Sequence, residues 1–125
     1  MMTWIQTYKG RKFFPLDPRP DDIYIRDISH RLGLLYRFNG HSVVFYSVAD
    51  HSVLVSRAVA EEHALWGLLH DASEAYISDL PRPIKKKMPD FLEIEERIQR
   101  AVAERLGLLW PIVLETRNPS SKQGK

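Results

Sequence analysis

Two histidines and two carboxylates in the middle of the chain have the types and spacing that metal chemistry needs: His51, His70, Asp71 and Glu74. Glu74 follows His70 by four residues and Asp71 by three, so on a helix its side chain lies near both. A carboxylate beside an imidazole at the end of an apolar helix is costly to bury unless hydrogen bonds or a metal compensate it. Imidazole and carboxylate suit zinc, manganese, cobalt, nickel, iron or magnesium, so the ligand types do not choose among these metals.

The simpler alternative is that these histidines are ordinary packing residues. A His–Asp dipeptide occurs by chance in many proteins, and a histidine on an apolar helix face is more often hydrogen-bonded than metal-bound. We interpret His30 and His63 in this way, as surface or packing residues. The chain contains no cysteine, which excludes disulfide scaffolds, thiolate zinc sites, iron–sulfur clusters and cysteine nucleophiles. Any metal must therefore be bound by His, Asp and Glu.

The candidate residues have to be positioned by helices. A helical apolar period predicts a first helix over residues 27–37, with Asp27 as its N-cap and Asn39–Gly40 as its end. A second helix is predicted over residues 48–62, capped by Ser47. This second helix carries the first histidine of the candidate site.

The other three candidate residues belong to a third predicted helix, which runs unbroken from about residue 62 to residue 77. Gly67 indicates close packing against another backbone, and the apolar face is assigned to Ala64, Leu65, Leu68, Leu69 and Ala72. A fourth helix is predicted over residues 90–107, beginning at Asp90 and ending at Gly107.

The remaining segments lack a helical period. Residues 79–89 are predicted to be a loop with at most a short turn of helix, because three prolines interrupt them. Residues 1–25 read as an irregular lead-in that packs on the body through Trp4, Tyr8, Phe13 and Phe14, and residues 116–125 read as a loose tail. No run alternates convincingly enough to predict a sheet. We predict one all-α domain over residues 1–125, with its helical body at 27–110.

Four submotifs, in this order, resemble the HD-domain metal-dependent phosphohydrolases: RFNGH, YSVADHS, LLHDASEAY and SDLPRP. The similarity covers roughly residues 20–110 and is closest to the small single-domain branch related to bacterial 5′-deoxynucleotidases. It implies a compact helical bundle that binds one divalent metal through a His on one helix, a His–Asp pair on the next and a distant Asp. The first three ligands map onto His51, His70 and Asp71.

The resemblance implies further roles. Glu74 is similar to the catalytic carboxylate that positions or activates the attacking water, and Asp79 is similar to a residue that contacts the sugar or the leaving group. Arg37 resembles an arginine that holds the substrate phosphate, with a solvated helix-end charge as the alternative. His41 could add a phosphate contact or cap the turn. Lys85 could attract phosphate at the pocket edge or belong to a solvated surface run.

The chain departs from this family at its end. The final metal-binding Asp of the family lies on a later helix, in a stretch resembling EADxR, whereas no Asp follows Asp90 here and Glu115 is the nearest carboxylate. We therefore expect an HD-like bundle that lacks the last metal-binding helix. Three ligands can still hold a metal, as in catalytic zinc sites, with reduced affinity.

The expected activity is hydrolysis of a nucleotide, most naturally a (deoxy)nucleoside monophosphate, by a metal-activated water that attacks phosphorus. The missing Asp motivates an alternative, a degenerate HD protein of weak or no activity that binds nucleotide or a protein partner. A helical interaction module with a few buried histidines is a third interpretation.

Charge and hydropathy narrow the expected partners. The 18 Lys and Arg against 16 Asp and Glu leave a diffuse net charge of +2, which does not fit a protein that binds duplex nucleic acid. No apolar run approaches the roughly 20 residues of a membrane span, and the N-terminus has no apolar signal region. We expect a cytoplasmic protein with no membrane partner. An apolar face left by the missing helix, together with the resemblance, favours a homodimer.

Overall fold

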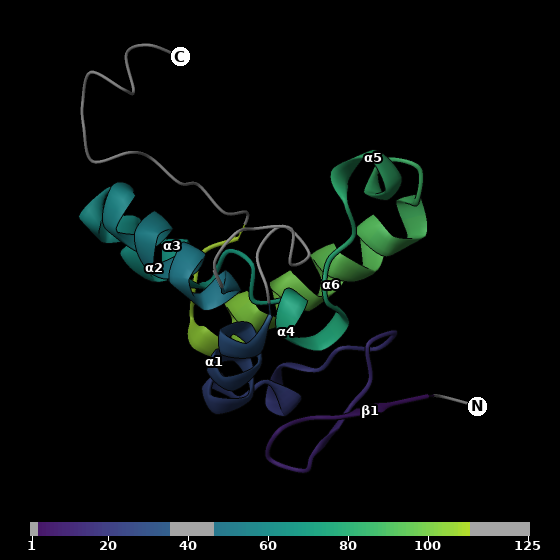
Figure 1. The fold of residues 1–125 in the computed structure, drawn as a ribbon. Coiled ribbons are helices and arrows are strands. Elements are labelled where there is room, and N and C mark those ends of the chain that lie inside the picture. Colours follow the sequence, from purple (N-terminus) through teal and green to yellow (C-terminus); the bar gives the residue numbers. More distant parts are fainter. Residues whose placement is uncertain (1–2, 36–46, 111–125) are drawn as a thin grey trace.

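The structure is a computed structural model that describes residues 3–35 and 47–110. Its first half contains two short strands, a 3-10 turn and a helix: β1 (Ile5–Gln6), β2 (Lys12–Phe13), η1 (Pro20–Asp22) and α1 (Ile25–Leu34) (Figure 1). Its second half contains α2 (Val48–Ala58), the 3-10 turn η3 (Glu61–His63), α3 (Ala64–Leu69), α4 (Glu74–Ile77), α5 (Arg82–Lys85) and α6 (Pro89–Leu106). The two strands form a single small hairpin, so the all-α prediction is confirmed for the described residues.

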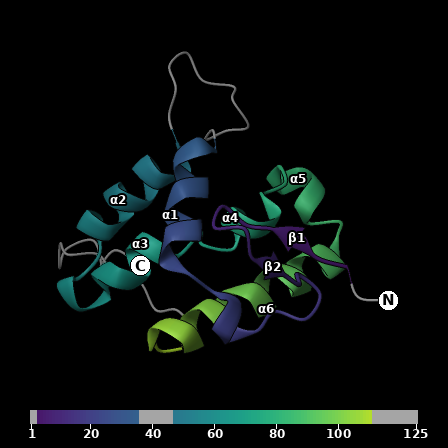
Figure 2. The same cartoon turned by 90° about the horizontal axis from the view of Figure 1, so that it is seen from below.

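The helices pack around one apolar core. α1 contacts both α2 and α4, α2 packs along α3, and η1 and α5 rest on the long helix α6 (Figure 2). The core is built from buried side chains of β2, the helices α1, α2, α3, α4 and α6, and two connecting residues: Phe13, Ile23, Ile28, Leu32, Val48, Leu69, Ala72, Tyr76, Ile98, Ala101 and Val102. Within the described residues, no helix combines the length and apolarity that crossing a bilayer requires.

The lead-in is more regular than predicted, because β1 and β2 pair as an antiparallel hairpin. Its turn contains Gly10 with φ of 78°, a left-handed conformation that glycine adopts without strain. Phe13 is fully buried and stacks on Tyr76 with ring centroids 4.0 Å apart. Trp4 and Tyr8, in contrast, stay 46% and 61% exposed. Tyr8 nevertheless stacks on His30 of α1 with ring centroids 3.6 Å apart. The expected packing of the aromatic side chains on the body is therefore correct for Phe13 and Tyr8, whereas Trp4 stays largely exposed.

The first helix begins earlier than predicted, and Asp27 is not its N-cap. Tyr24 occupies that position, and α1 ends at Leu34, while Asn39–Gly40 lie outside the described residues. Asp27 lies in the first helical turn, is only 3% exposed, and accepts a hydrogen bond from the Lys9 backbone N–H at 2.9 Å. The helix dipole favours a carboxylate at this position. The same carboxylate connects the hairpin to α1 by a contact between residues 18 positions apart, which local sequence does not indicate.

The prediction that Ser47 caps the second helix is confirmed. Its hydroxyl accepts the Asp50 backbone N–H at 3.0 Å, and the Asp50 carboxylate accepts the Ser47 N–H at 3.3 Å, which forms a capping box. The helix ends at Ala58, four residues before the predicted end.

The predicted unbroken third helix is wrong, since residues 70–73 form turns between α3 and α4. A buried side chain of α6 supports this break. The Gln99 amide accepts the Ser73 backbone N–H at 2.6 Å and donates to the Leu69 carbonyl at 3.3 Å. The break therefore leaves these two backbone groups hydrogen-bonded in the interior, where an unpaired polar group would be costly.

The buried face of α3 also differs from the prediction. Leu65 and Leu68 were expected in the core but are 49% and 37% exposed, while Trp66 is buried and donates a hydrogen bond to the Leu109 carbonyl at 2.7 Å. The loop prediction for residues 79–89 is confirmed, with α5 as its short helical turn. α6 begins at Pro89 and ends at Leu106, followed by Gly107 in the left-handed conformation. Both ends lie within one residue of the bounds predicted for the fourth helix.

Candidate metal centre

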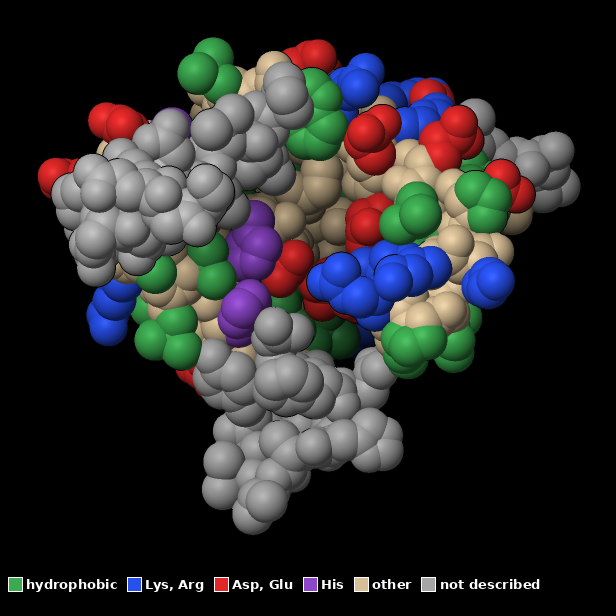
Figure 3. Space-filling model, turned by 90° about the horizontal axis from the view of Figure 1, so that it is seen from above, with side chains coloured by type: hydrophobic (Ala, Val, Ile, Leu, Met, Phe, Trp, Pro, Cys, Tyr) green, Lys and Arg blue, Asp and Glu red, His purple; other side chains and the backbone are tan. Residues whose placement is uncertain are grey.

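Three of the predicted site residues meet between α2 and α3. His51 lies on α2, His70 is the C-cap of α3, and Asp71 follows it; one ligand atom from each lies within 4.8 Å of the others. The Asp71 Oδ2 atom is 3.0 Å from His70 Nε2 and 3.9 Å from His51 Nε2. Histidine and acidic side chains lie side by side on this face of the molecule (Figure 3).

The helices reach this arrangement through one close contact. A Cβ atom placed on Gly67 would lie 2.9 Å from the Ser56 Cα atom, so only glycine allows α3 to approach α2 this closely. His70 follows Gly67 by three residues, and its ring centroid lies 5.2 Å from that of His51. The prediction of close packing at Gly67 is therefore confirmed, and this packing brings the two imidazoles together.

The His70 ring is oriented by the backbone of its own helix. Its Nδ1 lies 2.7 Å from the Gly67 carbonyl oxygen, which can only accept a hydrogen bond, so Nδ1 carries the proton. In the neutral imidazole the Nε2 lone pair then faces the Asp71 carboxylate. Such a backbone contact is how metal-binding histidines are commonly fixed in the correct tautomer.

The donor set fits a divalent cation. Two imidazole nitrogens and one carboxylate oxygen converge, and their side chains remain between 19% and 27% exposed, so they are neither fully buried nor freely solvated. Divalent ions such as zinc, cobalt or manganese accept this combination of nitrogen and oxygen ligands. His51, His70 and Asp71 could therefore hold a metal ion, whose identity they leave open.

Glu74 begins α4 beside this group and hydrogen-bonds to the Asp71 side chain. Burial raises the pKa of its carboxyl group to about 8, and the negative charges of Asp71 and Asp79 add to this effect. The Lys85 ammonium acts in the opposite direction but is outweighed. In the metal-free chain Glu74 is thus protonated at neutral pH, with a pKa in the range useful for proton transfer.

Asp79 and Lys85, both predicted as site residues, are joined to each other. The Lys85 ammonium pairs with Asp79 and with Glu95 of α6, the latter at 3.2 Å. Lys85 is therefore held between two carboxylates, in contrast to the solvated run considered as its alternative. Glu95 was not predicted, because it lies ten residues from Lys85 among other acidic residues of an amphipathic helix, and nothing local distinguishes it.

Several predictions of site residues are not decided by this geometry. Arg37 and His41, the predicted phosphate contacts, lie outside the described residues, as does Glu115. His30 and His63, interpreted as packing or surface residues, are not among the converging ligands. His30 stacks on Tyr8 with ring centroids 3.6 Å apart, and His63 lies 3.7 Å from Glu62.

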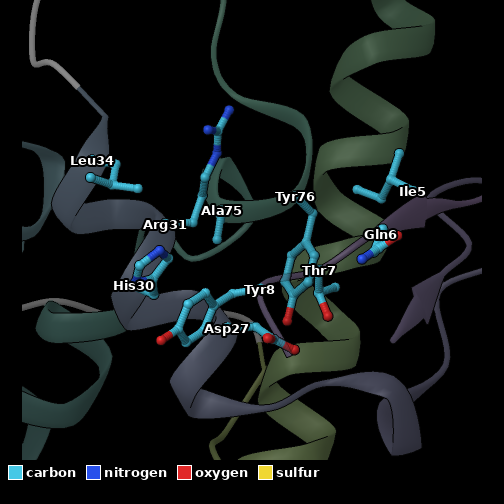
Figure 4. A pocket seen from close by; sticks show the side chains of 10 residues that line it. All are labelled: Ile5, Gln6, Thr7, Tyr8, Asp27, His30, Arg31, Leu34, Ala75 and Tyr76. Carbon is cyan, nitrogen blue, oxygen red and sulfur yellow. The ribbon is translucent and has the colours of Figure 1, made fainter. Parts of the chain in front are cut away.

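A cavity of about 510 Å³ lies between the hairpin, α1 and α4, and none of the candidate metal ligands lines it (Figure 4). The stacked rings of Tyr8 and His30 and the buried side chains of Asp27 and Tyr76 form part of its wall. Burial raises the pKa of Tyr76 above its ordinary value, and the Asp27 charge adds to this, so the phenol stays neutral. The cavity is separate in its lining residues from the metal centre.

Comparison with known proteins gives two long matches and one short one. The chain is 44% identical over 115 residues to the uncharacterized protein YfdR of Escherichia coli, covering 92% of this chain and 64% of that protein. It is 38% identical over 121 residues to the uncharacterized protein RCAP_rcc00048 of Rhodobacter capsulatus, covering 89% and 61% respectively. The chain thus spans less than two thirds of the length of these two relatives.

The short match carries a named activity. A 5′-deoxynucleotidase of Vibrio atlanticus is 39% identical over 51 residues, which is 41% of this chain and 26% of that enzyme. No protein-family model matches the chain.

Proposed function

We propose that this protein is a metal-dependent phosphohydrolase that acts on a nucleotide, with (deoxy)nucleoside monophosphates as the substrate class. The observation that carries the proposal is the convergence of His51, His70 and Asp71, two imidazoles and a carboxylate whose ligand atoms lie within 4.8 Å of one another. The partial similarity to a 5′-deoxynucleotidase supports the same chemistry.

His51, His70 and Asp71 would hold the divalent cation, which when bound would lower the pKa of a water molecule and offset the negative charge of a phosphoryl group. Glu74 stands next to Asp71 with a pKa near neutrality in the metal-free chain, which suits it to orient the attacking water and accept its proton. A cation beside Asp71 would offset the negative charge of that carboxylate, so Asp71 would repel the ionised form of Glu74 less and the pKa of Glu74 would fall. Asp79 is proposed to contact the sugar or the leaving group, and Arg37, His41 and Lys85 are proposed to contact phosphate.

Replacement of the paired ligands tests the assignment. We expect His70→Ala and Asp71→Ala to lose bound metal and all phosphate release from deoxyadenosine monophosphate, whereas His63→Ala keeps both. Elemental analysis after loading with manganese or cobalt, followed by a phosphate-release assay, measures the two properties. Unchanged metal content in either ligand variant would contradict the assignment of these residues as metal ligands. A wild-type chain that binds metal but releases no phosphate would instead favour a degenerate, binding-only protein.

A further inference from the structure

Lys85 occupies a defined place between two elements. It is the last residue of α5, its side chain is 22% exposed, and its ammonium contacts Asp79 Oδ1 on one side and Glu95 Oε2 on the other. Asp79 and Lys85 both act electrostatically on Glu74, which hydrogen-bonds to Asp71. Lys85 therefore lies at the edge of the candidate metal centre.

The segment that carries Lys85 is poorly anchored by its own side chains. Residues 81–84 and 86–90 are all exposed, so burial does not fix the position of α5. Glu95, in contrast, belongs to an 18-residue helix whose next turn contributes the fully buried Ile98 to the core. The Lys85–Glu95 contact thus connects an exposed turn to a rigid support.

The acidic residues around Lys85 indicate what the Lys85–Glu95 contact does. Asp71, Asp79 and Glu95 are acidic groups near the site, and an anionic phosphoester would be repelled by them unless a positive group stood in its path. A lysine free to pair only with Asp79 could rotate away from that path. A second carboxylate on a fixed helix restricts where the ammonium can lie.

We propose that Glu95 is a positioning residue, which holds the Lys85 ammonium beside Asp79 at the edge of the metal centre so that it attracts the phosphate of an anionic substrate. This inference rests on the proposed function for the identity of the ligand. It assigns Glu95 a role in phosphate affinity and no contact with the reacting atoms.

The test uses the complete chain loaded with manganese, with inorganic phosphate as the probe in titration calorimetry. Glu95→Asp keeps the negative charge but shortens the side chain, so the carboxylate no longer reaches the Lys85 ammonium. It is expected to weaken phosphate binding about fivefold and Lys85→Met about tenfold, with manganese content unchanged in both. Lys85→Arg, which keeps the charge, retains phosphate binding. Glu96→Asp is the matched control, because Glu96 is the adjacent residue on α6 and is 61% exposed.

A double variant separates positioning from simple stabilisation. If Glu95 acts through Lys85, adding Glu95→Asp to Lys85→Met weakens phosphate binding no further than Lys85→Met alone. A Glu95→Asp protein with lowered melting temperature but wild-type phosphate affinity overturns the inference, because the contact of Glu95 with Lys85 then only stabilises the packing of α5 on α6. Absence of phosphate binding by the metal-loaded wild-type chain overturns it as well. A wild-type chain that binds phosphate but cleaves no nucleotide contradicts the proposed function alone.

Discussion

His70 shows how a single backbone contact prepares a side chain for a metal. The Gly67 carbonyl accepts a hydrogen bond from Nδ1–H, and this leaves Nε2 as the atom that faces Asp71 at 3.0 Å. The sequence indicated His70 as a ligand because it belongs to a submotif, LLHDASEAY, that resembles a known metal-binding family, but its tautomer follows only from the geometry of the helix end. His70 and Asp71 lie at that end, where the last carbonyls of α3 are available to them.

Glu74 makes the stability of the metal-free chain depend on pH. Its pKa rises from 4.5 to about 8 on folding, so between these values the folded chain holds a proton that the unfolded chain has released. The free energy of unfolding should therefore fall as pH rises through this window, and Glu74→Gln should remove that part of the slope.

Urea unfolding in the presence of a chelator, at pH 5, 6.5 and 8, measures this effect. The exposed Glu93 of α6 offers a control, since Glu93→Gln should leave the wild-type slope in place. Parallel pH curves for the wild-type and Glu74→Gln proteins would show that Glu74 keeps its ordinary pKa on folding.

Among the helices, the contact between α2 and α3 depends on the absence of a side chain at Gly67. An alanine Cβ there would lie 2.9 Å from the Ser56 Cα atom and 3.1 Å from its backbone nitrogen, and backbone atoms cannot move aside cheaply. Gly67→Ala should lower the free energy of unfolding by about 1–3 kcal/mol.

Gly33 of α1 provides the matched comparison, because a Cβ at that position meets nothing within 4 Å. Gly33→Ala should raise the free energy of unfolding by up to about 1 kcal/mol, since alanine loses less backbone entropy in a helix. Denaturant titration of both variants checks the opposite signs. A Gly67→Ala protein as stable as wild type would mean that α2 and α3 are farther apart.

The helices themselves were predictable to different degrees. Ser47 and Gly107 are local signals, and they mark the start of α2 and the end of α6 correctly. The break after α3 was missed because Gln99, which satisfies the backbone there, lies 26 residues from Ser73. Asp27 was misread as a cap because its partner, the Lys9 N–H, is 18 residues away.

The chain as a whole should gain stability from the metal. His51 and His70 come from different helices, so an ion bound to both ties α2 to α3 and favours the folded state over the unfolded state. At a hundredfold excess over its dissociation constant, a metal adds about 2.7 kcal/mol, which corresponds to a rise in melting temperature of roughly 10 °C.

Differential scanning fluorimetry with manganese, with and without excess chelator, measures this rise. His70→Ala should show none of it, whereas His63→Ala should show all of it. An equal rise in the His70→Ala protein would place the metal elsewhere.

The homodimer, the cytoplasmic location and the nucleotide substrate stay predictions.

The fold class could be predicted from the amino-acid sequence, because helix periodicity and caps involve residues within one or two turns of each other. The candidate ligands were predicted from the four ordered submotifs and their resemblance to a known family, since the His–Asp pair alone is a weak signal. Only the tertiary structure decided the break between α3 and α4, the burial of Asp27 and the pairing of Lys85 with Glu95. Each of these depends on a partner at least ten residues away, and such partners are chosen by packing of the whole core, which no local propensity encodes. The convergence of His51 and His70 belongs to both classes: their residue types were visible in the sequence, but their distance was decided by the bare backbone of Gly67.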